Sequence, residues 1–294
     1  MAESLATLLD LLTRPEFVAG FVVGLIALGL LFLTPAPTRG TAVDWGLLLA
    51  AGTMIAIHLT AGRRFGLAAG IGLLAIGGWA QSRSKTAISP LGWTLVGLGA
   101  VVVAWRGGFS GSMWFLSITA LVIAITGWTL ARWSVHLPSD LLGPLFAMSA
   151  FGIWATVPET EMARALLGTA IPMGVATLRP VEGRLTHPGA YALAGVVIWV
   201  VASGGEARPA SIIGGWACMG VLLILPYCTP TGSDLIKQRP LVIILVHAAV
   251  VLVASRAIGL WESVIPATIA ATFLAAVAYI FLGYLLKSDG EPSV

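Results

Sequence analysis

The clearest shortage in this sequence is charge, because Asp, Glu, Lys and Arg together make up only 10% of its 294 residues. A soluble domain carries roughly 25% charged residues, which cover its surface in water. Hydrophobic residues make up 58% of this chain, and its mean hydropathy is +0.96. This balance excludes an ordinary soluble domain and predicts that long apolar segments face lipid.

Cysteine and recognisable catalytic motifs are also scarce. The two cysteines, Cys218 and Cys228, lie on one predicted helix at a spacing of about 15 Å along its axis, which excludes a disulfide between them. The chain contains no P-loop, GxGxxG, HExxH or GxSxG sequence. Its longest polar connection, Thr229–Pro240, is too short to hold a soluble catalytic domain. We therefore expect a protein that is not an enzyme and that has no cofactor and no metal.

Basic residues show no clustering of the kind that binds nucleic acid. The 16 Lys and Arg residues are scattered over short connections, whereas a nucleic-acid binder gathers them on one face. The expected partners are membrane lipids, a small-molecule substrate and a membrane-protein partner, with no nucleic acid.

What the sequence has in abundance is apolar runs separated by short polar connections. The predicted fold class is therefore all-α, a polytopic integral membrane helical bundle with 10–11 transmembrane helices. Several runs are shorter than the roughly 20 residues of a full crossing, so ten spans also fit if one pair forms a re-entrant hairpin. The predicted spans are residues 17–33, 45–60, 65–79, 91–105, 113–130, 141–156, 162–178, 188–202, 211–227, 241–254 and 264–286.

The predicted domain organisation is simple. Residues 1–15 form a short N-terminal interfacial segment, residues 16–287 the transmembrane domain, and residues 288–294 a C-terminal tail. The N-terminus lacks the basic start and the cleavage site of a signal peptide, so the first apolar run is expected to remain as a span.

One internal similarity predicts a parallel repeat of four helices. Pro90–Gly107 aligns without gaps on Pro188–Gly205, which makes residues 88–183 and 186–287 the candidate copies. The alternative is chance similarity between segments written mostly in Ala, Gly, Val and Leu.

Charge asymmetry predicts the orientation and the location of the protein. With eleven spans, nine Lys or Arg residues lie on the C-terminal side of the membrane and seven on the other side. The positive-inside rule then favours a cytoplasmic C-terminus. The preference for Arg over Lys is typical of a GC-rich bacterial genome, so we expect a multi-pass protein of the bacterial plasma membrane.

Small and aromatic residues predict how the helices pack. Gly20 and Gly24, like Gly66 and Gly70, have the GxxxG spacing that lets two helices approach closely. Most tryptophans fall near predicted span ends, where an indole prefers the headgroup level. Trp199 lies inside a span and is expected to pack between helices.

Glu159 and Glu161 are the most prominent polar pair, and two interpretations remain open. In the structural interpretation, Thr156 and Glu159 form a capping box at the start of a helix, and Glu161 pairs with Arg164 three residues later. In the functional interpretation, the two carboxylates gather a cation or a protonated substrate at an aqueous entrance.

The following span adds two further candidates for substrate binding or gating. Thr169 carries a hydroxyl into an apolar run, and Pro172 removes a backbone hydrogen bond and leaves a carbonyl free one turn earlier. Interrupted helices of this kind line transporter sites, although proline also occurs in ordinary membrane helices.

His58 and His247 are the histidines inside apolar runs. Two histidines on separate helices have the chemistry to hold a haem. Each is better explained as a packed, hydrogen-bonded imidazole, so no cofactor is expected.

The leading functional interpretation is a transporter or permease-like protein for a neutral or amphiphilic small molecule. All 13 carboxylates lie in connections or at span ends, which argues against a strongly proton-coupled pump. The competing interpretation is a non-transporting membrane scaffold or an accessory subunit of an envelope complex. A membrane enzyme ranks third, and it needs a histidine close to Glu159 and Glu161.

Overall fold

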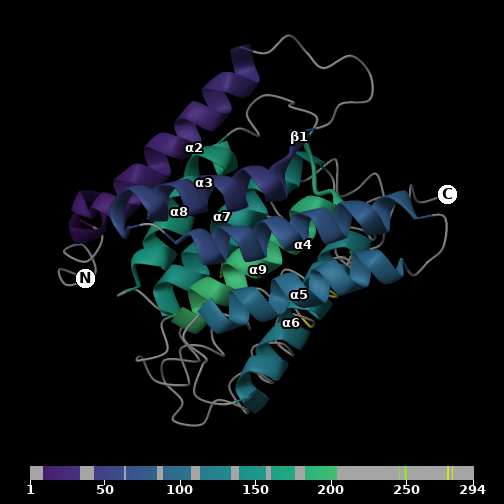
Figure 1. Cartoon of the computed structure of the whole chain (residues 1–294). Helices are drawn as coiled ribbons and strands as arrows, with labels where there is room; N and C mark the ends of the chain where they lie inside the picture. The colour runs from purple at the N-terminus through teal and green to yellow at the C-terminus, as the bar shows by residue number, and fades with distance from the viewer. Residues whose placement is uncertain are drawn as a thin grey trace, which may run out of the picture.

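The computed structural model describes residues 9–33, 43–62, 64–84, 89–106, 113–133, 139–156, 160–175 and 183–203, together with five single residues nearer the C-terminus. These parts are almost entirely α-helical (Figure 1), as predicted. The helices are α2 (Pro15–Leu33), α3 (Trp45–Thr60), α4 (Phe65–Arg83), α5 (Pro90–Arg106), α6 (Met113–Trp133), α7 (Ser139–Thr156), α8 (Glu161–Val175) and α9 (His187–Ser203). Each coincides with a predicted apolar run to within a few residues. The predicted spans 211–227, 241–254 and 264–286, and most of the proposed second repeat, lie outside the described residues.

Two very short strands precede α3 and α9. β1 (Val43–Asp44) and β2 (Gly183–Arg184) pair in parallel, with Val43 opposite Gly183 and Asp44 opposite Arg184. This pairing holds the beginnings of α3 and α9 at the same end of the bundle.

Consecutive helices run in alternating directions across the bundle. α3 and α9 are parallel, because Asp44 contacts both of their first turns while Arg64, which follows α3, contacts Trp199 near the end of α9. α4 and α5 are antiparallel, because Gly66 faces Arg106 at one end and Gly92 faces Gln81 at the other. We call the two ends of the bundle the Arg64 end and the Asp44 end.

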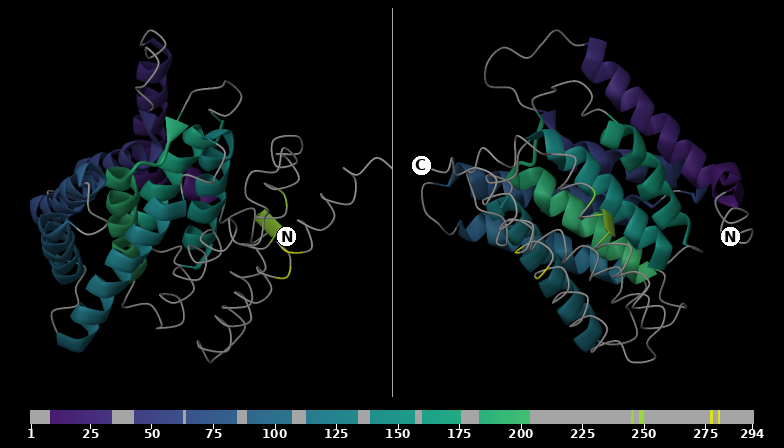
Figure 2. Two further views of the ribbon diagram at one scale, coloured as in Figure 1. Left: turned by 90° about the vertical axis from the view of Figure 1, so that its right-hand side faces the viewer. Right: turned by 180° about the vertical axis from the view of Figure 1, so that it is seen from behind.

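α9 is the central helix of the described bundle. It packs against α3, α4, α5, α6 and α8, and Figures 1 and 2 show it in the middle of the described helices. Every residue from Gly189 to Val200 is buried. Glycines let neighbouring elements approach α9 closely on several sides. An added Cβ at Gly195 would lie 2.5 Å from Leu74 of α4, and one at Gly189 would overlap Asp44.

Both GxxxG pairs lie in helix contacts, which confirms the packing prediction. An added Cβ at Gly20 would lie 2.5 Å from the carbonyl oxygen of Ala165, so the backbones of α2 and α8 touch there. Gly66 and Gly70 face Arg106 and Val103 of α5. Glycine at these positions permits the close approach that drives helix association without a hydrophobic effect.

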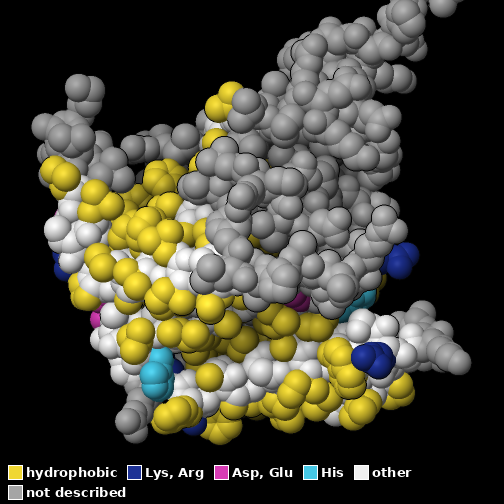
Figure 3. All heavy atoms as spheres, turned by 90° about the horizontal axis from the view of Figure 1, so that it is seen from above, with side chains coloured by type: hydrophobic (Ala, Val, Ile, Leu, Met, Phe, Trp, Pro, Cys, Tyr) yellow, Lys and Arg dark blue, Asp and Glu magenta, His cyan; other side chains and the backbone are white. Residues whose placement is uncertain are grey.

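The outer helices carry many exposed apolar side chains. Along α6, Trp114, Ile118, Leu121, Ile125 and Trp128 form an exposed stripe at helical spacing, and α2 has a similar stripe from Val18 to Leu30. Figure 3 shows hydrophobic side chains over much of the described surface in that view. Among the described residues, Phe65–Arg83 is the one helix that meets a combined length and composition criterion for a membrane span.

The tryptophan prediction is confirmed only in part. Trp79, Trp105 and Trp114 are exposed near helix ends, and Trp199 is buried between helices as expected. Trp45 and Trp154 are buried, although their positions near helix ends predicted headgroup exposure. The burial of both rings shows that a position near a helix end does not by itself imply exposure.

Candidate functional site

The sequence-predicted residues of α8 lie in its contact with α2 and α3. The hydroxyl of Thr169 donates to the carbonyl of Ala165 at 2.9 Å, and the side chain fills the space left by Gly20 and Gly52. Pro172 lies inside α8 and packs against Gly24. A cavity bordered by α3, α7, α8 and α9 has a volume of only about 10 Å³ and an almost wholly apolar lining. Thr169 and Pro172 therefore shape a closed helix contact in this structure.

Arg164 makes a contact that the sequence spacing did not predict. Its guanidinium lies 3.6 Å from the carboxylate of Glu16 on α2, and both side chains are largely buried. This pair joins the first turns of α2 and α8 at the Arg64 end. The predicted partner, Glu161, is the exposed first residue of α8.

The proposed capping box is wrong in its position. Thr156 is the last residue of α7, and α8 begins at Glu161. The residue before α8 is Thr160, whose carbonyl accepts the amide of Arg164 at 3.3 Å. The sequence has a threonine at position 156 and another at position 160. Because α7 extends to Thr156, it is Thr160 that directly precedes α8. Glu159 lies outside the described residues.

The histidine prediction is tested at one position only. His58 is exposed on α3, and its ring contacts Phe65 with 5.4 Å between the centroids. His247 lies outside the described residues. Within the described ranges, His, Cys, Asp and Glu side chains form no group of three that could hold a metal ion.

A carboxylate at the Asp44 end joins two helix beginnings. Asp44 accepts hydrogen bonds from the amides of Gly46 and Leu47 in the first turn of α3, at 2.9 and 3.2 Å. It also accepts from the amide of Gly189 at 3.0 Å and from the hydroxyl of Thr186, at the start of α9. Burial raises the pKa of Asp44, and these four hydrogen bonds oppose the rise. One side chain thus satisfies orphan amides of two helices.

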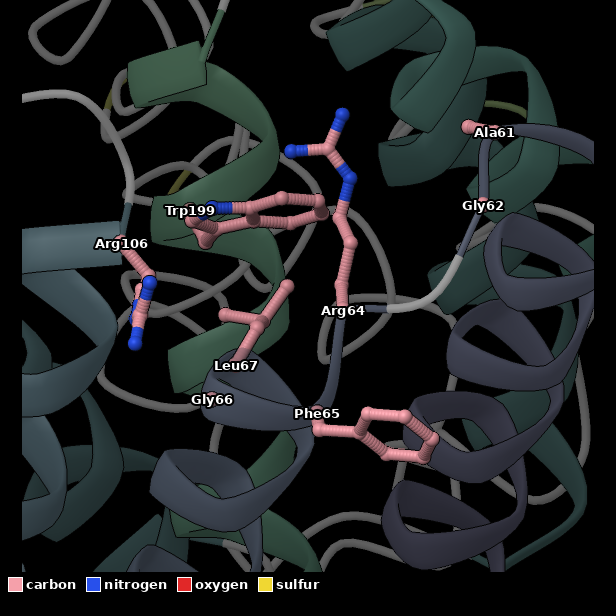
Figure 4. Close-up of a pocket in the computed structure, with 8 residues that line it drawn as sticks. All are labelled: Ala61, Gly62, Arg64, Phe65, Gly66, Leu67, Arg106 and Trp199. Carbon is pink, nitrogen blue, oxygen red and sulfur yellow. The ribbon is translucent and has the colours of Figure 1, made fainter.

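A cavity at the Arg64 end has a different chemistry. It has a volume of about 450 Å³ and is lined by residues from the α3–α4 turn, the first turn of α4, the end of α5 and α9. These residues are Ala61, Gly62, Arg64, Phe65, Gly66, Leu67, Arg106 and Trp199 (Figure 4). Its volume falls in the range of about 300–1,000 Å³ that is usual for ligand pockets.

Local backbone features open this cavity. Gly62 has a φ of +89°, a left-handed conformation that suits glycine and turns the chain between α3 and α4. Gly66 has no side chain, so the guanidinium of Arg106 lies directly against the first turn of α4: an added Cβ would be 2.5 Å from its Nε.

Polar groups around the cavity are only partly satisfied. The guanidinium carbon of Arg64 lies 5.7 Å from the centroid of the Trp199 ring, in a cation–π contact. Nε of Arg64 and Nε1 of Trp199 are buried and have no hydrogen-bond partner in the described part of the chain. Neither Arg64 nor Arg106 forms an ion pair with any described carboxylate.

Sequence reasoning missed this cavity, although one signal for it was present. The eleven-span topology places Arg64 and Arg106 on the same side of the membrane, and Trp199 is an indole inside a span. These facts did not show that the three side chains meet, because they come from helices far apart in the sequence. No protein-family model matches this chain, and no curated protein is significantly similar to it in sequence.

Proposed function

We propose that this chain is a polytopic protein of the bacterial plasma membrane that acts as a permease-like carrier for an amphiphilic small molecule. The observation that carries the membrane assignment is the pair of exposed apolar stripes on α2 and α6, on opposite sides of a core that is itself apolar. In water, apolar patches of this extent are rare on monomeric proteins. In lipid they are the ordinary outer surface of a bundle.

The directions of the helices support the same proposal. The eight described helices alternate in direction, so that their ends gather at the Arg64 end and the Asp44 end. Charged residues in the described helices lie near these ends, for example Glu16, Arg83 and Arg106. Helices of 16 or 17 residues are about 24–26 Å long at 1.5 Å per residue. They require local bilayer thinning or long side chains that reach the interface, since the hydrocarbon core is about 30 Å thick.

The cavity at the Arg64 end favours an amphiphilic molecule over a neutral one. Arginine side chains line it together with Phe65, whose ring is exposed, and the buried Leu67. A molecule with a polar head and an apolar body matches both kinds of lining. We propose no enzymatic reaction at this cavity.

The alternative is a non-transporting scaffold or an accessory subunit of an envelope complex. One observation favours it: Gly29, Gly72 and Gly97, on α2, α4 and α5, have no atom within 4 Å of an added Cβ. Open glycines on outer helices allow a partner helix to approach closely.

Native mass spectrometry of the gently extracted protein tests the two functions. A carrier should release one small amphiphile at near-unit stoichiometry, and reconstituted vesicles should then take up that molecule faster than empty vesicles. A stable protein partner without a ligand, and no uptake, would transfer the assignment to the scaffold. Extraction of the protein by alkaline carbonate would contradict the membrane assignment itself.

A further inference from the structure

The cavity at the Arg64 end combines several donors with no described acceptor. Arg64 and Arg106 bring two guanidinium groups, and no carboxylate is among the described lining residues. In the view of Figure 4, the indole of Trp199 lies between the two arginine side chains. Trp199 is 1% exposed, and its Nε1 has no hydrogen-bond partner in the described part of the chain. A buried donor without an acceptor costs free energy unless a ligand supplies one.

The first turn of α4 adds further donors at the same place. Arg64 occupies the cap position and provides no side-chain cap for the helix. The amides of Leu67 and Ala68 both donate to the carbonyl of Arg64, at 3.1 Å. Those of Phe65 and Gly66 have no acceptor within the described ranges. The N-terminus of a helix carries partial positive charge and attracts an anion.

The position of Arg64 is electrostatically unfavourable without a ligand. A cation at a helix N-terminus opposes the helix dipole, and Arg106 brings a second cation to the same turn. Arg106 alone has a simple structural explanation, since a cation suits the last turn of α5. Arg64 contacts the ring of Trp199, but this contact brings no negative charge, and an anion in the cavity removes the conflict.

We propose that this cavity binds a phosphate group, for which the lining arginines Arg64 and Arg106, Nε1 of Trp199 and the first-turn amides of α4 are the donors. Two guanidinium forks match the several oxygens of a phosphate better than the two oxygens of a carboxylate. A water molecule takes about 30 Å³, and a phosphate group is only a few times larger. The cavity of about 450 Å³ therefore has room for much more than one phosphate. The remaining space and the exposed ring of Phe65 fit the body of a phospholipid-like amphiphile. The inference rests on the proposed function only for the source of the phosphate, which a membrane supplies as a lipid headgroup.

Native mass spectrometry of the full chain in a neutral detergent tests this site with defined probes. The probes are short-chain phosphatidic acid, phosphatidylcholine with the same acyl chains, and inorganic phosphate. We expect one phosphatidic acid per chain, bound at least about tenfold more tightly than phosphatidylcholine. Competition by inorganic phosphate at a similar concentration would identify the free anion as the source, whereas retention of the lipid would identify the headgroup. Both results support the site.

Matched variants locate the binding. Arg64→Gln and Arg106→Gln should each weaken phosphatidic acid binding about tenfold, and Trp199→Phe, which removes only the indole donor, should weaken it severalfold. Arg83→Gln is the control, because Arg83 also stacks on a tryptophan, Trp79, at 5.1 Å but lies at the Asp44 end, away from the cavity. Arg106 is exposed, so its variant keeps the test valid if Arg64→Gln fails to fold.

Equal binding of phosphatidic acid by wild type and by folded Arg106→Gln would overturn the proposal, and so would equal binding of both lipids. In that case the arginines are interfacial anchors only. Uptake measurements on the same vesicles separate the two proposals. Specific binding without uptake supports the phosphate site and excludes the carrier function. Uptake that is unchanged in Arg106→Gln supports the carrier function and excludes the phosphate site.

Discussion

Two polar clusters, one at each end of the bundle, are satisfied in opposite ways. At the Asp44 end, one carboxylate accepts four hydrogen bonds and joins the first turns of α3 and α9. At the Arg64 end, two guanidinium groups and a buried indole line a cavity without a described acceptor. Both ends consist of a helix start, a turn and a few charges. The difference is that the first arrangement is complete within the protein and the second is completed only by a ligand.

This difference separates residues that stabilise the fold from residues that bind. Substitution of one residue in a fully hydrogen-bonded cluster lowers the free energy of unfolding, because its former partners are left buried and unpaired. Substitution of one residue in a cluster of like charges changes the free energy of unfolding little, because the loss of that charge relieves repulsion. Measurements of stability and of binding should therefore respond in opposite ways at the two ends.

The largest expected effect is that of Asp44→Ala. This change removes the acceptor from two helix starts and leaves the amides of Gly46, Leu47 and Gly189 unpaired. Since one lost cap costs about 0.5–2 kcal/mol, we expect a loss of about 1–4 kcal/mol in the free energy of unfolding. Unfolding in mixed detergent micelles measures it. Asp10→Ala is the control, because Asp10 pairs with Arg14 at the exposed N-terminal segment. Equal free energies of unfolding for Asp44→Ala and Asp10→Ala would contradict the structural role assigned to Asp44.

A somewhat smaller loss is expected for Gly20→Ala, in the contact between α2 and α8. The new methyl group would lie 2.5 Å from the carbonyl oxygen of Ala165, so the helices must move apart. Such overpacking costs about 1–3 kcal/mol. Gly29→Ala in the same helix is the matched control, since nothing lies within 4 Å of its added Cβ, and it should leave the stability unchanged or slightly raised. A loss at Gly29 equal to that at Gly20 would show that the contact is not responsible.

At the Arg64 end, Arg106→Gln should leave the free energy of unfolding within about 0.5 kcal/mol of wild type. The side chain is exposed and makes no ion pair with a described residue. Thermal unfolding without added lipid measures this, and phosphatidic acid should stabilise wild type more than the variant. A large decrease in the free energy of unfolding without lipid would show that Arg106 stabilises the fold, as Asp44 does at the other end.

The pH dependence of stability offers a finer test of the Asp44 end. Burial raises the pKa of Asp44 above its ordinary value of 3.8, so between these two values the folded state binds more protons than the unfolded state. The proton-linked part of the contribution of Asp44 to stability is therefore fully present below pH 3.8 and decreases as the pH rises through the folded pKa, while the hydrogen bonds that Asp44 accepts remain. Comparison of the pH profiles of wild type and Asp44→Asn isolates it. A contribution that increases with pH would mean that the hydrogen bonds outweigh burial.

The smallest effect is expected for Glu161→Gln. Glu161 is exposed at the first position of α8, and the structure pairs Arg164 with Glu16. Stability and uptake should both remain near wild type. A loss of uptake in well-folded protein would restore the functional interpretation of the glutamate pair.

The candidate residues of α8 could be predicted as chemistry but not as geometry. The sequence predicted a helix interrupted near Thr169 and Pro172; both lie in α8, but the helix continues through Pro172 to Val175. It did not predict that they fill the spaces beside Gly20, Gly52 and Gly24. Arg164 was assigned a partner three residues away, because local spacing is all that a sequence shows. Its contact with Glu16 requires α2 to lie beside α8.

The sequence by itself determined where helices form, because apolar runs and their polar ends are local properties of the chain. It also determined that charge is confined to the ends. Only the tertiary structure decided that α9 is central and buried while α6, equally apolar, exposes a stripe from Trp114 to Trp128. It alone brought Arg64, Arg106 and Trp199 to one cavity. The reason is physical: helix formation depends on neighbours within a few residues, whereas the choice of packing partner depends on the shapes of surfaces from distant parts of the chain.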